Sequence, residues 1–275
     1  MDFKRSCARA LQIKVGDVPI LVEFEEKALF DRTEKVYLRF KSKIKPLYRI
    51  DIRSTGYFRK SKKLRNKVIS SFRKDVYKIN CSEFRAQLDL KNKTGWIRLD
   101  PVSSSEVITS ALANLCMFIL LKQGAMLFHA CGVIKDKRAF IFSGPSGAGK
   151  STVAKLSSNL AILSEELLGI SYSGKHFKVF PLPYAGDAVF SRQSARPFPL
   201  AAVFRLVKDR SNFLEAVSKA RSSVDLLILP AQLDKFISFD GYFRTFHRLI
   251  RVTPCYNLHF RPDPSFWRCI DDEFN

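Results

Sequence analysis

The sequence has few acidic residues, few histidines and no closely spaced cysteines. Its 275 residues include 26 Asp and Glu against 47 Lys and Arg, so the formal net charge is +21, and there are four His. The six cysteines, at positions 7, 81, 116, 131, 255 and 269, form no Cys-x-x-Cys pair and no Cys/His cluster. This pattern argues against a zinc site or a disulfide framework and favours free thiols in a cytoplasmic protein.

Long hydrophobic runs are also missing. The most apolar stretch, ALANLCMFILL at 111–121, is shorter than the roughly 18–20 residues that span a bilayer. The N-terminal segment MDFKRSCARALQIKV has neither a long apolar region nor a cleavage site of small residues. With 46% hydrophobic residues and 24 Phe, however, the chain has ample material for a core. We expect a soluble, cytoplasmic protein without a membrane span.

The positive charge is concentrated in the N-terminal part. Residues 41–80 contain 14 basic residues and only two acids, Asp51 and Asp75. Such a segment can be a solvated face, or it can bind an acidic protein or peptide, an anionic membrane or a nucleic acid. No sequence pattern of a known nucleic-acid-binding module accompanies the charge, which favours a solvated face and disfavours nucleic acid. If the segment binds a partner, an acidic protein or peptide is expected.

Hydrophobic periodicity divides the chain near residue 100. Up to that point short segments alternate with a period of two, which predicts a smaller, mostly antiparallel β domain at 1–100. Ser103 and Glu106 fit a capping box before an apolar helix that reaches about Lys122. Residues 101–275 then read as an α/β domain. The segments read as strands before the boundary are LQIKV, ILVEF, KVYLRF, YRIDIR, KVISSF, VYKIN, AQLDL and GWIRL.

Strand and helix signals alternate in the C-terminal part. AMLFHACGVI, a KDK turn and RAFIFSG predict a β-hairpin that leads into a glycine-rich loop, and STVAKLSSN predicts the helix that follows. LAILSEELLGI reads as a strand or a strand and turn. AAVFRLV (201–207) and DLLILP (225–230) read as apolar runs on either side of a helix in SNFLEAVSKARSS.

The glycine-rich loop matches the phosphate-binding pattern G-x-x-x-x-G-K-[ST] in full. Glycines at its special positions allow backbone N–H groups to point at a phosphate, Lys150 reaches the β- and γ-phosphates, and the Ser151 hydroxyl ligates Mg²⁺. A nucleoside triphosphate, with ATP and Mg²⁺ as cofactors, is therefore predicted. The predicted nucleotide-binding residues are Gly144, Pro145, Ser146, Gly147, Ala148, Gly149, Lys150, Ser151 and Thr152.

Two further features could supply catalytic groups near this loop. Glu165 and Glu166 follow the first apolar strand after the loop helix, where carboxylates can reach Mg²⁺ and the γ-phosphate. An adjacent acid pair can equally be an ordinary helix N-terminus. His129 lies in the hairpin strand just before the loop. A single histidine in a strand is usually structural, but this hairpin leads directly into the phosphate loop.

Taken together, FHACGVIKDKRAFIFSGPSGAGKSTVAKL and LAILSEELLGI resemble the catalytic core of the HPr serine kinase superfamily, above all its HPr-kinase-related branch. PLPYAGD (181–187), PFPLAAVFRLVKDRSNFLEAVSKA (197–220) and RVTPCYNLHFRPDPSFW (251–267) are also similar to that branch. The resemblance covers roughly residues 110–270. It implies a phosphoenolpyruvate-carboxykinase-like P-loop fold that transfers a phosphoryl group from ATP to a serine or threonine hydroxyl of a protein or peptide.

By this resemblance, His129 is the active-site histidine, and the acid pair supplies the metal contact, assigned to Glu165, and the general base, assigned to Glu166. The chain departs from the family where Glu165 and Glu166 replace an Asp-Asp pair, and each glutamate is one methylene longer. A catalytically weak nucleotide-binding module, or a kinase for small-molecule hydroxyls, is therefore the alternative. The sequence leaves a homo-oligomer open.

Overall fold

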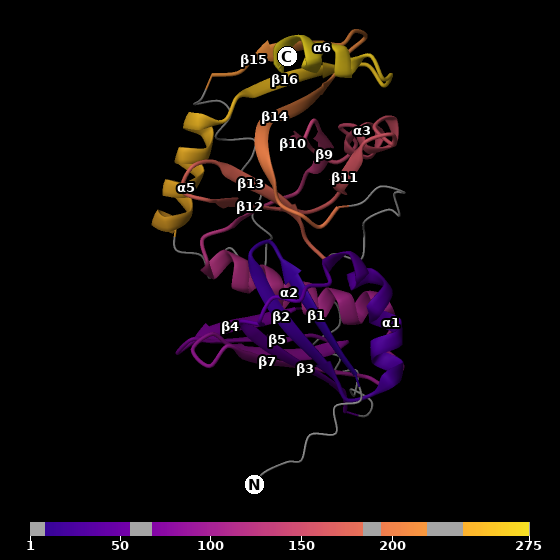
Figure 1. The fold of residues 1–275 in the computed structure, drawn as a ribbon, viewed down its shortest axis with the longest axis vertical. Helices are drawn as coiled ribbons and strands as arrows, with labels where there is room; N and C mark the ends of the chain where they lie inside the picture. The colour runs from indigo at the N-terminus through magenta and orange to yellow at the C-terminus, as the bar shows by residue number, and fades with distance from the viewer. Residues whose placement is uncertain (1–8, 56–67, 184–193, 219–238, 275) are drawn as a thin grey trace. The chain divides into compact units, whose positions relative to one another are not determined.

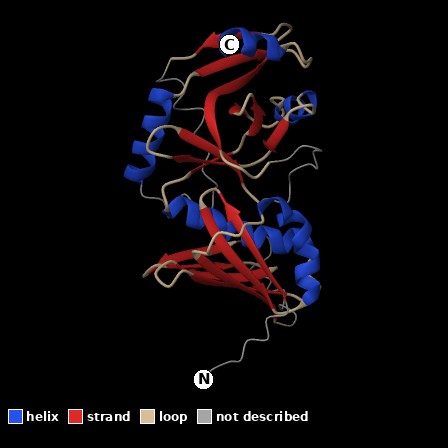
Figure 2. Cartoon of the chain, viewed as in Figure 1, coloured by secondary structure: helices blue, strands red, loops and turns tan. Residues whose placement is uncertain are grey.

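Two mixed sheets, each with its own helices, make up the described part of the chain. The structure is a computed structural model, and it describes residues 9–55, 68–183, 194–218 and 239–274. These residues form two compact units, the first reaching to Leu120 and the second containing most of the chain from Leu121 (Figures 1 and 2). Each unit combines strands and helices, so the chain is a mixed α/β protein.

The first unit contains a seven-stranded sheet with the order β1-β2-β3-β7-β6-β5-β4. The β2–β3 and β3–β7 pairs are parallel, and the other four pairs are antiparallel, as the alternating sequence pattern predicted. The hairpin between β4 and β5 turns through Lys74 and Asp75, both with positive φ, as a two-residue hairpin turn requires. The strands are β1 (Arg9–Val15), β2 (Val18–Phe24), β3 (Tyr48–Ser54), β4 (Ile69–Arg73), β5 (Val76–Asn80), β6 (Phe84–Asp89) and β7 (Thr94–Leu99).

Residues 35–40, predicted as a strand, are helical in the structure. Helix α1 (Lys27–Tyr37) is followed by the 3₁₀ turn η1 (Leu38–Phe40). Its buried side chains, Leu29, Thr33 and Tyr37, are four residues apart and form one helical face. The strand prediction was wrong because the alternation in KVYLRF is too short to distinguish a strand from the end of a helix.

Helix α2 (Ser105–Lys122) is the core helix of the first unit. By length and composition alone it could cross a membrane, but most of it is buried inside the structure. The Phe118 ring stacks on Tyr77 of β5 with ring centroids 3.8 Å apart, and the Tyr37 hydroxyl donates a hydrogen bond to the Thr109 carbonyl. These contacts group α2 with the N-terminal sheet, so the units divide beyond the boundary near residue 100 that the sequence suggests.

The second unit contains a nine-stranded sheet with the order β11-β9-β10-β14-β13-β12-β8. β16 pairs with β14, and β15 pairs with β16. The strands are β8 (Met126–Phe128), β9 (Cys131–Lys135), β10 (Arg138–Ser143), β11 (Ala161–Ser164), β12 (Leu168–Tyr172), β13 (Phe177–Pro181), β14 (Phe198–Lys208), β15 (Phe213–Ala216) and β16 (Cys255–Phe260).

Helices α3 (Lys150–Leu156), α5 (Phe239–Val252) and α6 (Phe266–Phe274) complete the second unit. Side chains of α3 and α6 share one hydrophobic core with β10, β14 and β16, while those of α5 share a second core with β8, β12 and β13. The turn between β9 and β10 falls at Asp136 and Lys137, which both have positive φ, where the sequence predicted a KDK turn.

Residues 213–216 were predicted as part of a helix, but they form strand β15. β15 pairs antiparallel with β16 in a register that aligns Phe213 with His259 and Ala216 with Tyr256. Partners more than forty residues away thus override the local helix preference. The helix prediction for 219–223, the apolar run 225–230, residues 184–187 of the PLPYAGD segment and the basic stretch 56–67 lie outside the described residues.

Candidate active site

The loop between β10 and α3 has the backbone that its glycines predict. Gly144, Gly147 and Gly149 have φ values of 154°, 78° and 115°, which L-residues with a side chain rarely adopt. Strand β10 ends one residue before the loop, and α3 begins at Lys150. The sequence therefore placed the strand, the loop and the helix correctly, whereas nucleotide binding by the loop stays a prediction.

Two of these glycines also lie where a side chain would collide. A Cβ atom at Gly144 would come within 2.7 Å of the Ala148 Cβ, and one at Gly149 within 3.0 Å of the Phe260 ring. A Cβ at Gly147 would meet nothing within 4 Å. Gly144 thus lets the loop close on itself at Ala148, Gly149 lets it pack against Phe260 of β16, and Gly147 lies on its open side.

Lys150 turns back over the loop that precedes it. Its ammonium group donates hydrogen bonds to the carbonyl oxygens of Gly144, at 2.8 Å, and Pro145, at 3.2 Å. The residue is buried, so its positive charge is held at the loop and not extended into solvent. The ammonium is therefore beside the backbone that would surround a phosphate.

The other predicted loop residues differ in accessibility. Pro145, Ser146 and Ser151 are exposed, Thr152 is half-buried and Ala148 is buried. Ser151 is thus available to a ligand at the first turn of α3, as its predicted Mg²⁺ contact requires. Ala148 contributes packing and the N–H that it donates to the Pro145 carbonyl.

The structure brings His129 and Glu166 together. The Nδ1 atom of His129 lies 3.4 Å from Oε2 of Glu166, and both side chains are 40% exposed. The contact follows from the β8–β12 pairing, in which Phe128 lies opposite Leu168, so the residues just outside each strand are neighbours. Both groups are half in solvent, so the pair adds only about 0–1 kcal/mol to stability. Its main effect is to orient the carboxylate.

Ser164, whose role the sequence analysis missed, anchors the turn that carries the acid pair. Its buried hydroxyl oxygen accepts hydrogen bonds from the backbone N–H groups of Glu166, at 3.1 Å, and Leu167, at 3.0 Å. A serine immediately before two acids at a strand end is a sequence signal for such a turn. Glu165 and Glu166 are therefore in a side-chain-bonded turn and not in the first turn of a helix.

Strand register places the loop, the histidine and the acid pair at the same end of the neighbouring strands β10, β9 and β11. β9 lies between β10 and β11, with Cys131 opposite Phe142 and Gly132 opposite Ser164. The start of β9 therefore lies beside the ends of β10 and β11. With about 4.8 Å between neighbouring strands, the ends of β10 and β11 are about 10 Å apart. A triphosphate with a bound cation can bridge such a distance between the loop and the acid pair.

The donor set at this end of the strands fits Mg²⁺ and a triphosphate. Hydroxyl and carboxylate oxygens, from Ser151 and from Glu165 or Glu166, are the hard ligands that Mg²⁺ takes alongside phosphate oxygens. The loop offers backbone N–H groups where positive φ and missing Cβ atoms allow close approach.

A second polar cluster lies at the ends of β14 and β16, outside the sequence predictions. The His259 ring contacts Asp209 Oδ2 through Nδ1 at 2.9 Å and Glu215 Oε2 through Nε2 at 3.5 Å, and it stacks on Phe213. The hydrogen bond from His259 lowers the pKa of Asp209 below its ordinary value. This cluster holds β15 against β16, and no short sequence motif marks it.

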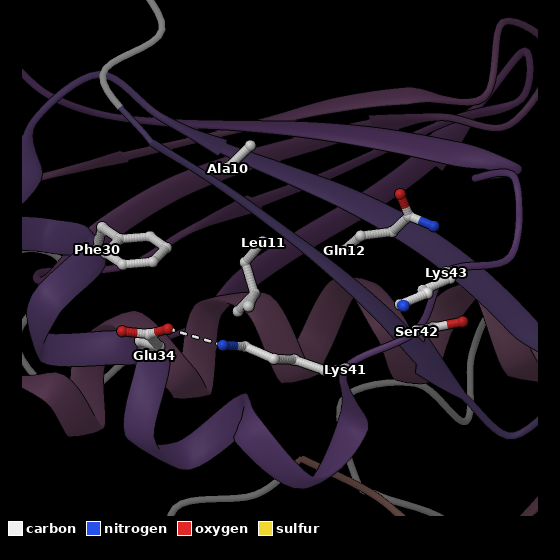
Figure 3. A pocket seen from close by; sticks show the side chains of 8 residues that line it. All are labelled: Ala10, Leu11, Gln12, Phe30, Glu34, Lys41, Ser42 and Lys43. Carbon is white, nitrogen blue, oxygen red and sulfur yellow. Dashed lines mark hydrogen bonds and ion pairs between the residues drawn. The ribbon is translucent and has the colours of Figure 1, made fainter.

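A pocket of about 380 Å³ lies in the first unit. Figure 3 shows the carboxylate of Glu34 of α1 turned toward the ammonium group of Lys41, and the two form an ion pair at 2.8 Å. None of the predicted site residues lines this pocket. Its lining residues are Ala10, Leu11, Gln12, Phe30, Glu34, Lys41, Ser42 and Lys43.

Comparison with known families identifies the C-terminal two thirds of the chain. The family model of the SynChlorMet cassette protein ScmC matches residues 96–275. The chain belongs to the ScmC family. The region that matches ScmC begins within β7 and contains the glycine-rich loop before α3, His129 and the Glu165–Glu166 turn.

Comparisons of this ScmC-family chain with curated proteins and with solved structures give less specific results. No curated protein matches it. Among solved structures it is similar to the Hpr(Ser) kinase/phosphatase from Coxiella burnetii, with 10% identity and a TM-score of 0.33, over 54% of this chain and 96% of that one. This likeness is distant, so membership of the HPr serine kinase superfamily stays a prediction from the sequence motifs.

Proposed function

We propose that this ScmC-family protein is an ATP- and Mg²⁺-dependent kinase that transfers the γ-phosphoryl group to a serine or threonine hydroxyl of a protein or peptide. The observation that carries the proposal is the convergence, at one end of neighbouring strands, of a glycine-rich loop that matches the phosphate-binding pattern in full and the His129–Glu166 pair. A phosphate loop alone is compatible with many activities. A paired carboxylate at the same end of the strands adds the group that a hydroxyl acceptor needs.

Each residue has a distinct part in the proposed reaction. Lys150 exchanges its carbonyl partners for β- and γ-phosphate oxygens, and the loop N–H groups hold the same phosphates. Ser151 and Glu165 would hold Mg²⁺, which would supply positive charge against the phosphates. Glu166 accepts the proton of the acceptor hydroxyl as the oxygen–phosphorus bond forms and the bond between the β–γ bridging oxygen and the γ-phosphorus breaks, which leaves ADP.

His129 acts on this reaction through the carboxylate. Its contact at 3.4 Å keeps Glu166 turned toward β8, and the two N–H groups bound by Ser164 fix the backbone beneath it. A carboxylate fixed from both sides is positioned for proton transfer, which typically contributes about 10²–10⁴-fold to rate.

Transfer from ATP labelled at the γ-phosphate tests the kinase proposal. The full chain is incubated with Mg·ATP and with proteins encoded beside it and an array of serine and threonine peptides as acceptors. We expect label on serine, and a loss of about 10²-fold or more in Glu166→Gln. Lys27→Gln, on the exposed side of α1, is the control that retains activity. Normal ATP binding without transfer to any peptide or protein would overturn the kinase proposal.

The acid pair itself favours one second candidate, a nucleotide-binding module with weak catalysis. Glutamates replace the aspartates of the family that the sequence resembles, and a displacement of about 1 Å at a reacting group can cost about 10²-fold in rate. The Glu165→Asp/Glu166→Asp double variant distinguishes the two candidates. A large gain in transfer would indicate a degenerate site, whereas a loss would indicate a kinase adapted to glutamate.

A further inference from the structure

Basic residues lie on the outer face of α5 and on the β12–β13 hairpin that contacts it, both in the second unit. The guanidinium of Arg248 lies 4.7 Å from the centre of the Tyr172 ring, so the helix and the hairpin are in contact (Figure 1). We call this the α5 basic surface. It consists of the exposed residues Lys175, His176, Arg244, His247, Arg248 and Arg251.

The inner face of α5 fixes the orientation of these side chains. Tyr242, Phe246, Leu249 and Ile250 are buried in the core shared with β8, β12 and β13. The residues between them must therefore point outward. The arginines at 244, 248 and 251 recur every three or four residues and span about 10.5 Å along the helix. They form a row on a rigid element.

Three cations of this surface have no acidic partner in the part of the chain that the structure describes. The side chains of α5 are described from residue 241 onward, and neither they nor those of the β12–β13 hairpin include an Asp or Glu. Among the described residues, no ion pair involves Lys175, Arg244 or Arg248. The N-terminal sheet is different, because Asp51 there contacts both Arg53, at 2.7 Å, and Arg98, at 3.2 Å. Lys175, Arg244 and Arg248, which have no acidic partner among the described residues, are therefore suited to binding an external anion.

Exposed apolar side chains adjoin the arginine row. Phe243 is 44% exposed beside Arg244, and Val252 is 62% exposed beside Arg251. The phosphate backbone of a nucleic acid would bind the arginines but would make no apolar contact with Phe243 and Val252. A polypeptide that carries both acidic and apolar residues would use both, as the helical and extended peptide ligands of many grooves do.

We propose that the α5 basic surface docks an acidic segment of the protein that this kinase phosphorylates. The proposal rests on the proposed function for the identity of its partner, whereas the binding of acidic polypeptide rests on the surface alone. Arginine guanidinium groups bind carboxylates through paired hydrogen bonds. The same charges raise the rate of encounter by about 10–10³-fold at low salt, an effect that salt weakens.

The test measures binding of a fluorescent twelve-residue peptide of alternating Glu and Leu to the full-length protein, at two salt concentrations. The Arg244→Glu/Arg248→Glu variant is compared with Lys27→Glu/Lys35→Glu, an equal charge change on the exposed face of α1. We expect the α5 variant to weaken binding about tenfold or more and the α1 variant to change it less than about twofold. Arg244→Gln/Arg248→Gln repeats the test without charge reversal, in case the first variant folds poorly.

Two further measurements distinguish a failure of nucleotide binding from a failure of docking, and an acidic polypeptide from other anionic partners. Mg·ATP affinity is measured for every variant, and we expect it to be unchanged, so a failure of nucleotide binding is distinguished from a failure of docking. Single-stranded DNA and vesicles containing an anionic lipid are titrated in parallel. Equal peptide affinity in the wild type and both α5 variants would overturn the proposal. Tighter binding to DNA or vesicles than to the peptide, lost in the same variants, would overturn an acidic polypeptide as the occupant.

Discussion

Replacing single glycines of the loop at 144–149 with alanine separates the cost of backbone strain from the cost of packing an added Cβ atom against its neighbours. At Gly149, φ is 115°, outside the left-handed well that other residues enter, and alanine would cost about 1–3 kcal/mol for this strain. Its Cβ would also approach the Phe260 ring to 3.0 Å, and such overpacking typically costs about 1–3 kcal/mol. We therefore expect Gly149→Ala to destabilise the second unit by about 4 kcal/mol.

Gly147→Ala is the matched control in the same loop. Its φ of 78° lies near the left-handed well, and a Cβ there would meet nothing within 4 Å. Only the backbone cost of about 1 kcal/mol remains. The two variants therefore make the same chemical change, within two residues of each other, at sites that differ mainly in packing.

Calorimetric unfolding of the full chain without nucleotide measures both effects. For a unit of this size, each kcal/mol moves the midpoint by about 2–4 °C, so we expect a fall of about 8–16 °C for Gly149→Ala and about 2–4 °C for Gly147→Ala. Equal falls for the two variants, or no change in either, would refute the packing of the loop against β16.

Three further predictions concern other contacts. Phe118→Ala removes the ring stacked on Tyr77 in the first unit, and we expect a loss of about 3–5 kcal/mol in its denaturant-induced unfolding, read by near-ultraviolet circular dichroism. Ser164→Ala leaves two N–H groups of the acid turn without their acceptor, so transfer of label from ATP labelled at the γ-phosphate should fall relative to the wild type. The pKa of Asp209 is lowered by its bond to His259, so the stability it adds is present above pH 3.8 and is lost as pH falls through the lower folded value. The difference in unfolding free energy between wild type and Asp209→Asn should thus be present at pH 6 and shrink toward pH 3.

Local signals were sufficient for the segment that leads into the site. The β9–β10 hairpin, its turn at Asp136 and Lys137, the loop and α3 follow from alternation, turn chemistry and the spacing of three glycines. Each of these signals lies within a few residues of the structure it specifies, which is why the sequence predicts them.

Pairings between distant segments were not predictable in the same way. Strand β15 exists because β16, more than forty residues later, pairs with it. The His129–Glu166 contact depends on the pairing of β8 with β12, so the sequence suggested both residues as site candidates without predicting that they touch. The α5 basic surface was missed because its charge is spread over a helix and a hairpin, whereas the charge run at 41–80 is continuous in the sequence.

Titration calorimetry of the full-length protein with Mg·ATP tests the central claim most directly. We expect saturable binding of one nucleotide per chain, and affinity at least about 10²-fold weaker in Lys150→Ala, because that variant removes the cation held over the loop. Absence of binding by the wild type, or equal affinity in the two proteins, would contradict the assignment of residues 144–152 as a nucleotide site.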